Sequence, residues 1–213
     1  MMPGMGAVAT TFIAGVELVN KGLAGPVGSL VEFETVRLGK RTDNRVPKIK
    51  DLVPLAGTEE LVFGGWDAFP KDAYEAAALD GVLEKEHLNA VREQLKEIRP
   101  FPAVFDSRYV LRIEAAHRKD CVSLGEATEQ VREDMRTFKS EHGFDRAAMI
   151  HCASTEAYAQ PQKAHFDLDE FEAALERRTL RSLRRWSTPT LPSRRVCLTP
   201  TAPRLSRSTF PPS

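Results

Sequence analysis

Apolar side chains recur at helical spacing in several stretches of the chain. Residues 7–23 carry them at intervals of three and four, which predicts a helix that Gly22 ends. Shorter helices are predicted over residues 72–79 and 85–98, and a Ser123-x-x-Glu126 capping box opens a longer one that runs to His142. The side chains expected on the buried faces are Val8, Phe12, Ile13, Val16 and Val19, then Leu88, Val91, Leu95 and Ile98, then Leu124, Ala127, Val131, Met135 and Phe138.

Short apolar runs between these helices are typical of buried strands. We expect strands over residues 28–38, 61–63, 103–105 and 147–152, with Gly64 and Gly65 stopping the second. Strands that alternate with amphipathic helices predict an α/β fold, a doubly wound parallel sheet with helices on both faces. In such a fold the 85–98 stripe belongs to the core rather than to a partner surface.

Charges are divided unevenly along the chain. The 213 residues contain 30 basic and 30 acidic side chains, yet residues 177–213 hold nine arginines and no acidic residue. Residues 1–176 therefore have a net charge of −9. Of the 37 tail residues, 27 are Arg, Ser, Thr or Pro, a composition without helical or strand periodicity. We expect a folded domain over residues 1–176 and an unstructured tail over 177–213.

Composition also bounds the class of protein. Three cysteines are too few for a disulfide framework, and no apolar run reaches the ~18 residues of a membrane span. We expect a cytoplasmic protein with no membrane partner.

The first nine residues contain a glycine pattern typical of dinucleotide-binding turns. In Gly4-x-Gly6-x-x-Ala9 the first glycine permits a tight turn, the second lets the backbone approach a pyrophosphate, and the small third residue lets helix and strand pack closely. The phosphates would lie on free N–H groups at the positive end of the helix dipole. A glycine-rich helix start without a ligand explains the same residues equally well.

The position of this turn affects the sheet. Only three residues precede Gly4, so we expect a sheet that lacks its first strand. That strand is central in the common doubly wound order, and its loss would leave neighbouring strands unpaired. We therefore expect a chain that is marginally stable and prone to aggregate.

Further segments make the glycine pattern more specific. In chain order they read GAVATTFIAGVE at 6–17, VRLGKRTDNR at 36–45, LVFGGWD at 61–67, RPFPAVFD at 99–106 and CASTEAY at 152–158. Together they closely resemble the bacterial branch of the inositol-3-phosphate synthases (myo-inositol-1-phosphate synthases), over about residues 3–176. The resemblance implies a partial Rossmann-like domain with NAD as its cofactor.

The resemblance also implies an activity. Family members are isomerases (intramolecular lyases) that convert D-glucose 6-phosphate to 1D-myo-inositol 3-phosphate, in inositol and phospholipid biosynthesis, and they assemble as homotetramers. Hydride leaves C5 of the substrate to NAD⁺, the enolate attacks C1 in an intramolecular aldol step, and the hydride returns.

Residue roles follow from the same resemblance. Pyrophosphate contacts fall on Gly6, Ala7 and Val8, with Gly4 in the turn before them, and Asp67 matches the acidic partner of the adenosine ribose. The other matching positions are Ala103 and Val104 beside the adenine, and Cys152, Ala153, Ser154 and Thr155 along the dinucleotide. Two alternatives stay open: Asp67 as a helix N-cap, and the pair at 103–104 as plain core packing.

Other chemistries find less support in the sequence. His151 and Cys152 would face opposite sides of a strand, and the remaining histidines (87, 117, 142 and 165) show no ligand spacing, so we expect no metal site. The basic run at 37–50 is either a phosphate- or DNA-attracting surface or a solvated loop.

The family pattern stops after Glu176. The resemblance places the catalytic lysines and the tetramer-building sheet beyond this point, so we expect no catalytic residue here and no activity from this chain alone. Read one base out of frame, residues 178–187 can encode DPSLAPSMV, and the stretch from Val196 can encode VPYANGAP, both typical of the family at this point. We therefore expect a frameshift near Glu176 to Arg178.

One competing interpretation makes the tail functional. A non-catalytic nucleotide-binding fragment could use its nine tail arginines to bind nucleic acid with steep salt dependence. We favour it less, because the tail has one Trp, one Phe and no helical period, and so offers no stacking platform or recognition helix.

Overall fold

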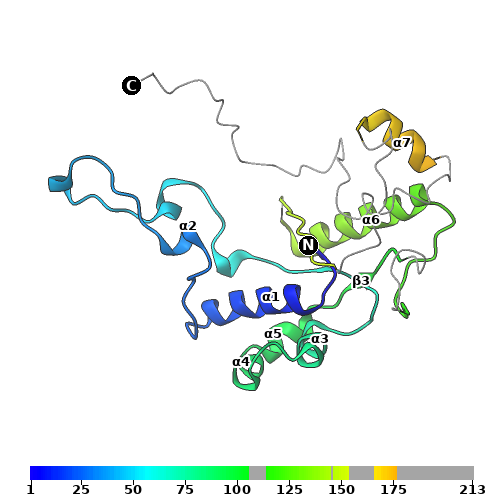
Figure 1. Cartoon of the computed structure of the whole chain (residues 1–213), viewed down its shortest axis with the longest axis horizontal. Helices are drawn as coiled ribbons and strands as arrows, with labels where there is room; N and C mark the ends of the chain where they lie inside the picture. Colours follow the sequence, from blue (N-terminus) through cyan, green and yellow to red (C-terminus); the bar gives the residue numbers. More distant parts are fainter. Residues whose placement is uncertain (106–113, 145, 154–165, 177–213) are drawn as a thin grey trace.

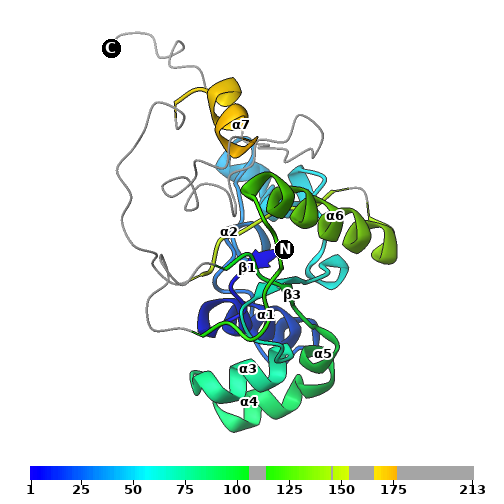
Figure 2. The ribbon, with the colours of Figure 1, turned by 90° about the vertical axis from the view of Figure 1, so that its right-hand side faces the viewer.

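The fold is a small parallel sheet between two layers of helices. The computed structural model describes residues 1–105, 114–144, 146–153 and 166–176. Within them the sheet has the order β1 (Met2–Pro3), β2 (Gly65–Asp67), β3 (Phe101–Pro102). One face carries α1 (Ala7–Asn20), α3 (Ala73–Asp80), α4 (Lys85–Ala90) and α5 (Arg92–Glu97); the other carries α6 (Leu124–His142), with α7 (Leu168–Glu176) beyond it (Figure 1, Figure 2). The predicted α/β class is confirmed.

The first strand is present, although it has only two residues. Met2 and Pro3 are both buried and pair in parallel register with β2. On the other side of β1, amides of the segment 148–152 donate to the carbonyls of Met1 and Pro3. The expectation of a sheet without its first strand is therefore wrong. Two residues suffice because hydrogen bonds hold them on both sides.

The second strand begins at Gly65, the second of two glycines that the sequence pattern predicts to end a strand. β2 starts at Gly65 rather than covering residues 61–63. A Cβ at Gly65 would lie 1.9 Å from the Met2 carbonyl oxygen, so a side chain there would prevent β1 and β2 from pairing. Glycine is therefore required by the close approach of the two strands.

The remaining strands also differ from their predicted positions. β3 comes two residues before the predicted 103–105, because Ala103 uses its N–H and C=O to pair with His117 and Lys119 instead. The predicted strand over 147–152 contributes hydrogen bonds to β1 without forming a regular strand.

Helix α1 buries a different face from the one that apolar spacing predicts. Of the five side chains expected inside, all of them among the described residues, Ile13 alone is buried. Val8 and Phe12 are 67% and 46% exposed. The buried face is small, consisting of Ala9, Thr10, Ile13, Ala14 and Leu18. A narrow face lets α1 pack closely on the sheet and on α3, and a search for large apolar side chains overlooks it.

The other helices lie close to their predicted positions. α3 matches the expected 72–79, and the expected 85–98 helix is interrupted at Val91 (φ −113°, ψ 16°), yet its apolar stripe is core as predicted. α6 has its predicted bounds and buried face. Ser123 Oγ accepts the Glu126 N–H at 3.1 Å, whereas the Glu126 carboxylate accepts from Val122 instead of from the cap residue.

A long arm leaves this body between α1 and β2. We call residues 21–57 the arm; all of them are described, and none is buried (Figure 1). The arm holds α2 (Leu30–Phe33), η1 (Arg41–Asp43) and η2 (Ile49–Leu52), and η3 (Thr58–Glu60) then returns the chain to α1. The strand predicted over 28–38 is wrong in its first half, which is helical, whereas residues 34–38 pair with 45–49 as a hairpin.

Candidate dinucleotide site

The turn between β1 and α1 depends on Gly4. Its φ is +84°, in the left-handed region that other residues rarely adopt. A Cβ at this position would lie 2.5 Å from the Cα of Ala153, so a side chain would also collide with the segment beside β1. The Gly4 N–H donates to the Trp66 carbonyl at 2.8 Å and ties the turn to β2. The turn is as tight as the glycine pattern predicts.

The N-terminus of α1 has room for a ligand. The helix starts at Ala7, and its cap residue Gly6 has no side chain to occupy the first N–H groups. Those groups have no partner inside a helix and carry the positive end of its dipole. A Cβ at Gly6 would meet a single described atom within 4 Å, a carboxylate oxygen of Asp80 at 4.0 Å. The backbone here can therefore be approached closely.

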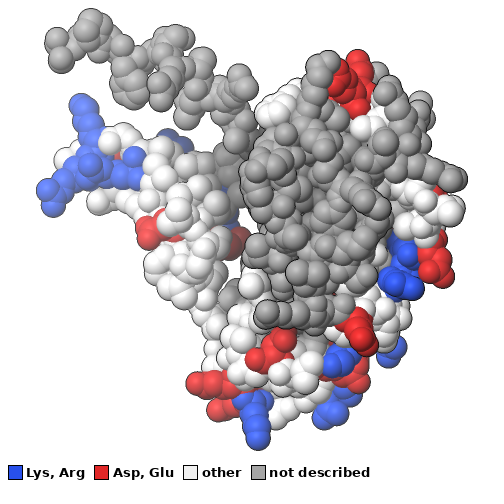
Figure 3. Space-filling model, turned by 45° about the vertical axis from the view of Figure 1, so that its right-hand side comes forward, with Lys and Arg blue, Asp and Glu red and all other residues white. Residues whose placement is uncertain are grey.

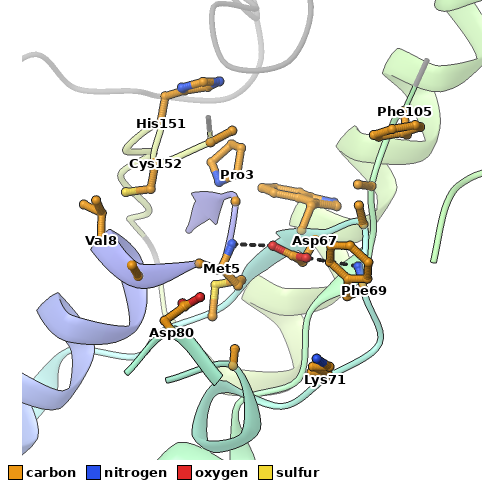
Figure 4. A pocket seen from close by; sticks show the side chains of 18 of the residues that line it. Pro3, Met5, Val8, Asp67, Phe69, Lys71, Asp80, Phe105, His151 and Cys152 are labelled. Carbon is orange, nitrogen blue, oxygen red and sulfur yellow. Dashed lines mark hydrogen bonds between the residues drawn. The ribbon is translucent and has the colours of Figure 1, made fainter. Parts of the chain in front are cut away.

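Asp67 ends β2 beside this turn. Its carboxylate accepts hydrogen bonds from the backbone N–H groups of Met5 at 2.7 Å and Phe69 at 3.0 Å (Figure 4). The N-cap of α3 is Asp72, which accepts the Glu75 N–H at 2.8 Å, so the interpretation of Asp67 as a helix cap is wrong. Two amides hold the Asp67 carboxylate at the edge of a cavity.

The turn, the helix N-terminus and Asp67 line the same cavity, which has a volume of about 600 Å³. Cofactor pockets are typically of this size. The cavity lining includes every described residue that the resemblance assigns to the dinucleotide: Gly4, Gly6, Ala7, Val8, Asp67, Ala103, Val104, Cys152 and Ala153. Ser154 and Thr155 lie outside the described residues. Ala103 and Val104 also pack against the cluster around Trp66, so the core-packing interpretation of this pair is confirmed, and the adenine contact stays a prediction.

Several cavity residues were not assigned to the site from the sequence. Among them are Phe69, Lys71, Asp80, Phe105 and His151, the last considered only as a metal ligand. Phe69 and Lys71 follow Asp67 by two and four residues, and ligands gather at the carboxyl ends of parallel strands, so their position could have indicated them. Asp80 ends α3 and belongs to no local motif, so only the tertiary fold brings it to the cavity.

His151 and Cys152 both line the cavity, although they are adjacent in the chain (Figure 4). Their side chains nevertheless point in different directions (Figure 4), as expected for an extended segment whose residues 150 and 152 donate hydrogen bonds to Met1 and Pro3. Within the described parts of the chain, no three His, Cys, Asp or Glu side chains are grouped closely enough to hold a metal ion.

The thiol of Cys152 has a shifted pKa. Burial raises the pKa of this thiol, and the positive charge of the Met1 amino group opposes the shift. The thiol therefore stays protonated near pH 7, and Cys152 contributes an apolar wall rather than a nucleophile.

Comparison with known proteins identifies the family. The NAD-binding family model described as myo-inositol-1-phosphate synthase matches residues 1–182. The chain belongs to the myo-inositol-1-phosphate synthase family. The resemblance drawn from the sequence motifs is thereby confirmed, and NAD is the cofactor that this family assignment supports.

Relatives in the myo-inositol-1-phosphate synthase family match the chain over part of their own length. Inositol-3-phosphate synthase 1 of Bacteroides thetaiotaomicron is 41% identical over 171 residues, which cover 80% of this chain and 39% of that protein. Inositol-3-phosphate synthase 1 of Oryza sativa subsp. japonica is 26% identical over 182 residues, covering 79% of this chain and 36% of that protein. The chain thus spans about two fifths of the length of these relatives.

A solved structure of the family has the same fold. The crystal structure of inositol-3-phosphate synthase from Caenorhabditis elegans aligns with a TM-score of 0.75 at 22% identity, covering 84% of this chain and 39% of that chain. None of the helices in the described part of the chain is both long and apolar enough to span a membrane.

Proposed function

We propose that the cavity binds NAD and that the chain is the cofactor-binding part of an inositol-3-phosphate synthase. The observation that carries this proposal is convergence: a glycine turn, an open helix N-terminus and a held carboxylate line the same cavity. A glycine-rich helix start without a ligand would not need a carboxylate and an apolar wall beside it.

Each part of the cavity suits one part of NAD. Gly4 shapes the turn, and the pyrophosphate is placed on the backbone of Gly6, Ala7 and Val8. The Asp67 carboxylate accepts from ribose hydroxyls and repels a 2′-phosphate, which favours NAD over NADP. The resemblance assigns the adenine to the neighbourhood of Ala103 and Val104, and Cys152 and Ala153 to the wall along the dinucleotide.

The reaction proposed for the whole enzyme is the isomerisation of D-glucose 6-phosphate to 1D-myo-inositol 3-phosphate in the cytoplasm, by a homotetramer. When bound, NAD supplies reversible hydride transfer without net consumption. The residues of this chain bind and orient the cofactor, whereas the resemblance places the catalytic lysines beyond Glu176, outside the cofactor-binding part. We therefore expect no turnover of glucose 6-phosphate by the 213-residue chain.

We further propose that residues 177–213 are read in a shifted frame and are no part of the folded domain. The out-of-frame peptides typical of the family support this. Resequencing the DNA across the codons for Glu176 to Arg178 tests it, since an intact frame there would reject the shift.

Calorimetric titration of the 213-residue chain with NAD and NADP tests the cofactor assignment. Asp67→Asn removes the negative charge and replaces one of the two carboxylate oxygens that accept the Met5 and Phe69 N–H groups. We expect NAD to bind about tenfold more weakly to this variant, because a hydrogen bond to a charged group contributes about 1.5–3 kcal/mol. The preference for NAD over NADP should shrink at the same time.

Asp80→Asn is the matched control, because it removes the same charge from the same cavity. Asp80 lies beside Gly6, where a carboxylate repels a pyrophosphate, so its neutralisation should leave NAD affinity unchanged or raise it. Equal losses of NAD affinity in both variants would mean that Asp67 acts only through its charge and not through specific hydrogen bonds to the ribose. Absence of NAD binding to the unmodified chain would overturn the proposed function.

A further inference from the structure

A buried polar cluster joins α6 to the strand that carries Asp67. Oδ2 of Asp134, on α6, accepts a hydrogen bond from Trp66 Nε1 at 2.6 Å and forms an ion pair with Lys119 Nζ at 2.7 Å. The Lys119 and Asp134 side chains are 8% and 14% exposed, and Trp66 is 5% exposed. Among the described residues, no other ion pair has two partners as buried as these.

The Trp66 branch of this cluster leads to Asp67. Trp66 precedes Asp67 in β2, and side chains alternate between the two faces of a strand. Holding the indole against α6 therefore directs the Asp67 carboxylate to the opposite face, where it meets the Met5 N–H at 2.7 Å. The position of Trp66 thus determines where the Asp67 carboxylate lies in the cavity.

The Lys119 branch leads to the other wall of the cavity. The Lys119 N–H donates to the Ala103 carbonyl at 2.9 Å, and the Ala103 N–H donates to the His117 carbonyl at 3.1 Å. The His117 N–H donates in turn to the Ala68 carbonyl at 2.9 Å. Backbone hydrogen bonds therefore join three segments, residues 66–68, 103 and 117–119. Asp134 contacts the first through Trp66 and the last through Lys119.

Stability alone is a poor explanation for this cluster. Desolvation of two buried charges offsets most of their attraction, so well-packed apolar residues serve stability as well or better. A single oxygen that binds donors from two segments does fix the distance between those segments. Geometry is therefore what the cluster contributes.

We propose that Asp134 is a positioning residue for the adenosine half of the dinucleotide site. Through Trp66 it orients Asp67, and through Lys119 it holds the wall formed by residues 103 and 104. The inference rests on the proposed function of the cavity. Asp134 does not belong to the cavity lining, so it acts through its two partners.

Asp134→Asn in the 213-residue chain is the first test. Without the negative charge, the single amide oxygen accepts more weakly from both Trp66 Nε1 and Lys119 Nζ, so both links that Asp134 makes are loosened. We expect ADP-ribose, measured by calorimetry, to bind about tenfold more weakly, and nicotinamide mononucleotide to bind unchanged. Glu133→Gln is the control on the same helix, because Glu133 is 66% exposed and pairs with Arg136. It should change neither affinity.

A double variant separates positioning from stability. Asp134→Asn with Lys119→Met removes the unpaired charge, so the stability lost in the single variant should return. The affinity for ADP-ribose should stay about tenfold weak, because the link between the two segments is still missing. If affinity returned together with stability, Asp134 would be structural only, and the proposal would be overturned.

A measurement without ligand keeps this inference distinct from the proposed function. Hydrogen exchange at the Met5 amide, which donates to Asp67, should accelerate in Asp134→Asn and stay unchanged in Glu133→Gln. Unchanged exchange in Asp134→Asn would overturn the positioning role even where NAD binds. Faster exchange in a chain that binds no ADP-ribose would support the orientation of Asp67 and overturn its use for a nucleotide.

Discussion

Two glycines with similar backbone angles have different importance in this molecule. Gly4 and Gly22 have φ values of +84° and +68°. A side chain at Gly22 would meet open space, whereas one at Gly4 would meet the Ala153 backbone at 2.5 Å. Conformational strain is thus common to both positions, and the steric collision is specific to the dinucleotide turn.

The pair gives a matched test of the turn. Gly22→Ala should cost about 1–2 kcal/mol of stability, the usual penalty for a left-handed residue, and should leave NAD affinity unchanged. Gly4→Ala should cost more than this and should abolish measurable NAD binding, because Ala153 must move. Urea denaturation and calorimetry measure the two effects. NAD binding by Gly4→Ala at normal affinity would show that the turn is not the phosphate site.

Local motifs account for the site residues that the sequence could indicate. Gly4 and Gly6 stand in a spacing whose meaning depends on neighbouring residues alone, and Asp67 follows an apolar run. Asp80 and Asp134 could not be found in this way, since Asp80 lies beside Gly6 and Asp134 bonds to Trp66, each more than sixty residues away in the chain. Long-range packing brings them to the site, and a single sequence gives no signal for it.

At the scale of elements, α6 was the most predictable and the strands were the least. The bounds of α6 follow from a Ser123 cap, a continuous apolar stripe and a Gly143 with φ +66°. β1 and β3 have two residues each, which is too short for any periodicity, and their positions depend on which segments pair. The position of α1 was predicted correctly, but the wrong face was predicted to be buried, because most of the residues on its buried face are small.

The cap of α6 provides a test of this element. Ser123→Ala should lower the free energy of unfolding by about 1 kcal/mol, because the Glu126 N–H loses its acceptor. Ser29→Ala is the comparison: Ser29 caps α2 with a weaker bond of 3.4 Å, and α2 has four residues and buries none. We expect a loss near zero there. Equal losses in urea denaturation would mean that the arm unfolds together with the body.

At the scale of the whole molecule, the arm is a segment that buries no residue against the rest of the chain. Most of its large apolar side chains are exposed, among them Val27 at 73% and Leu30 at 72%. Lys and Arg side chains gather at its tip (Figure 3), and none of the basic residues of the 37–50 run lines the cavity. The run therefore lies on an exposed loop away from the cavity, and both interpretations of it stay predictions.

Limited proteolysis should therefore divide the chain at the arm first. Trypsin needs a locally open backbone, and segments without buried side chains open at little cost in free energy. Among cuts within residues 1–105, we expect the earliest after Lys40, Arg41 or Arg45, before any after Lys85 or Arg92 on α4 and α5. Mass spectrometry of the fragments over time identifies the order. Earlier cuts in α4 or α5 would show that these helices open more readily than the arm, and would contradict this prediction.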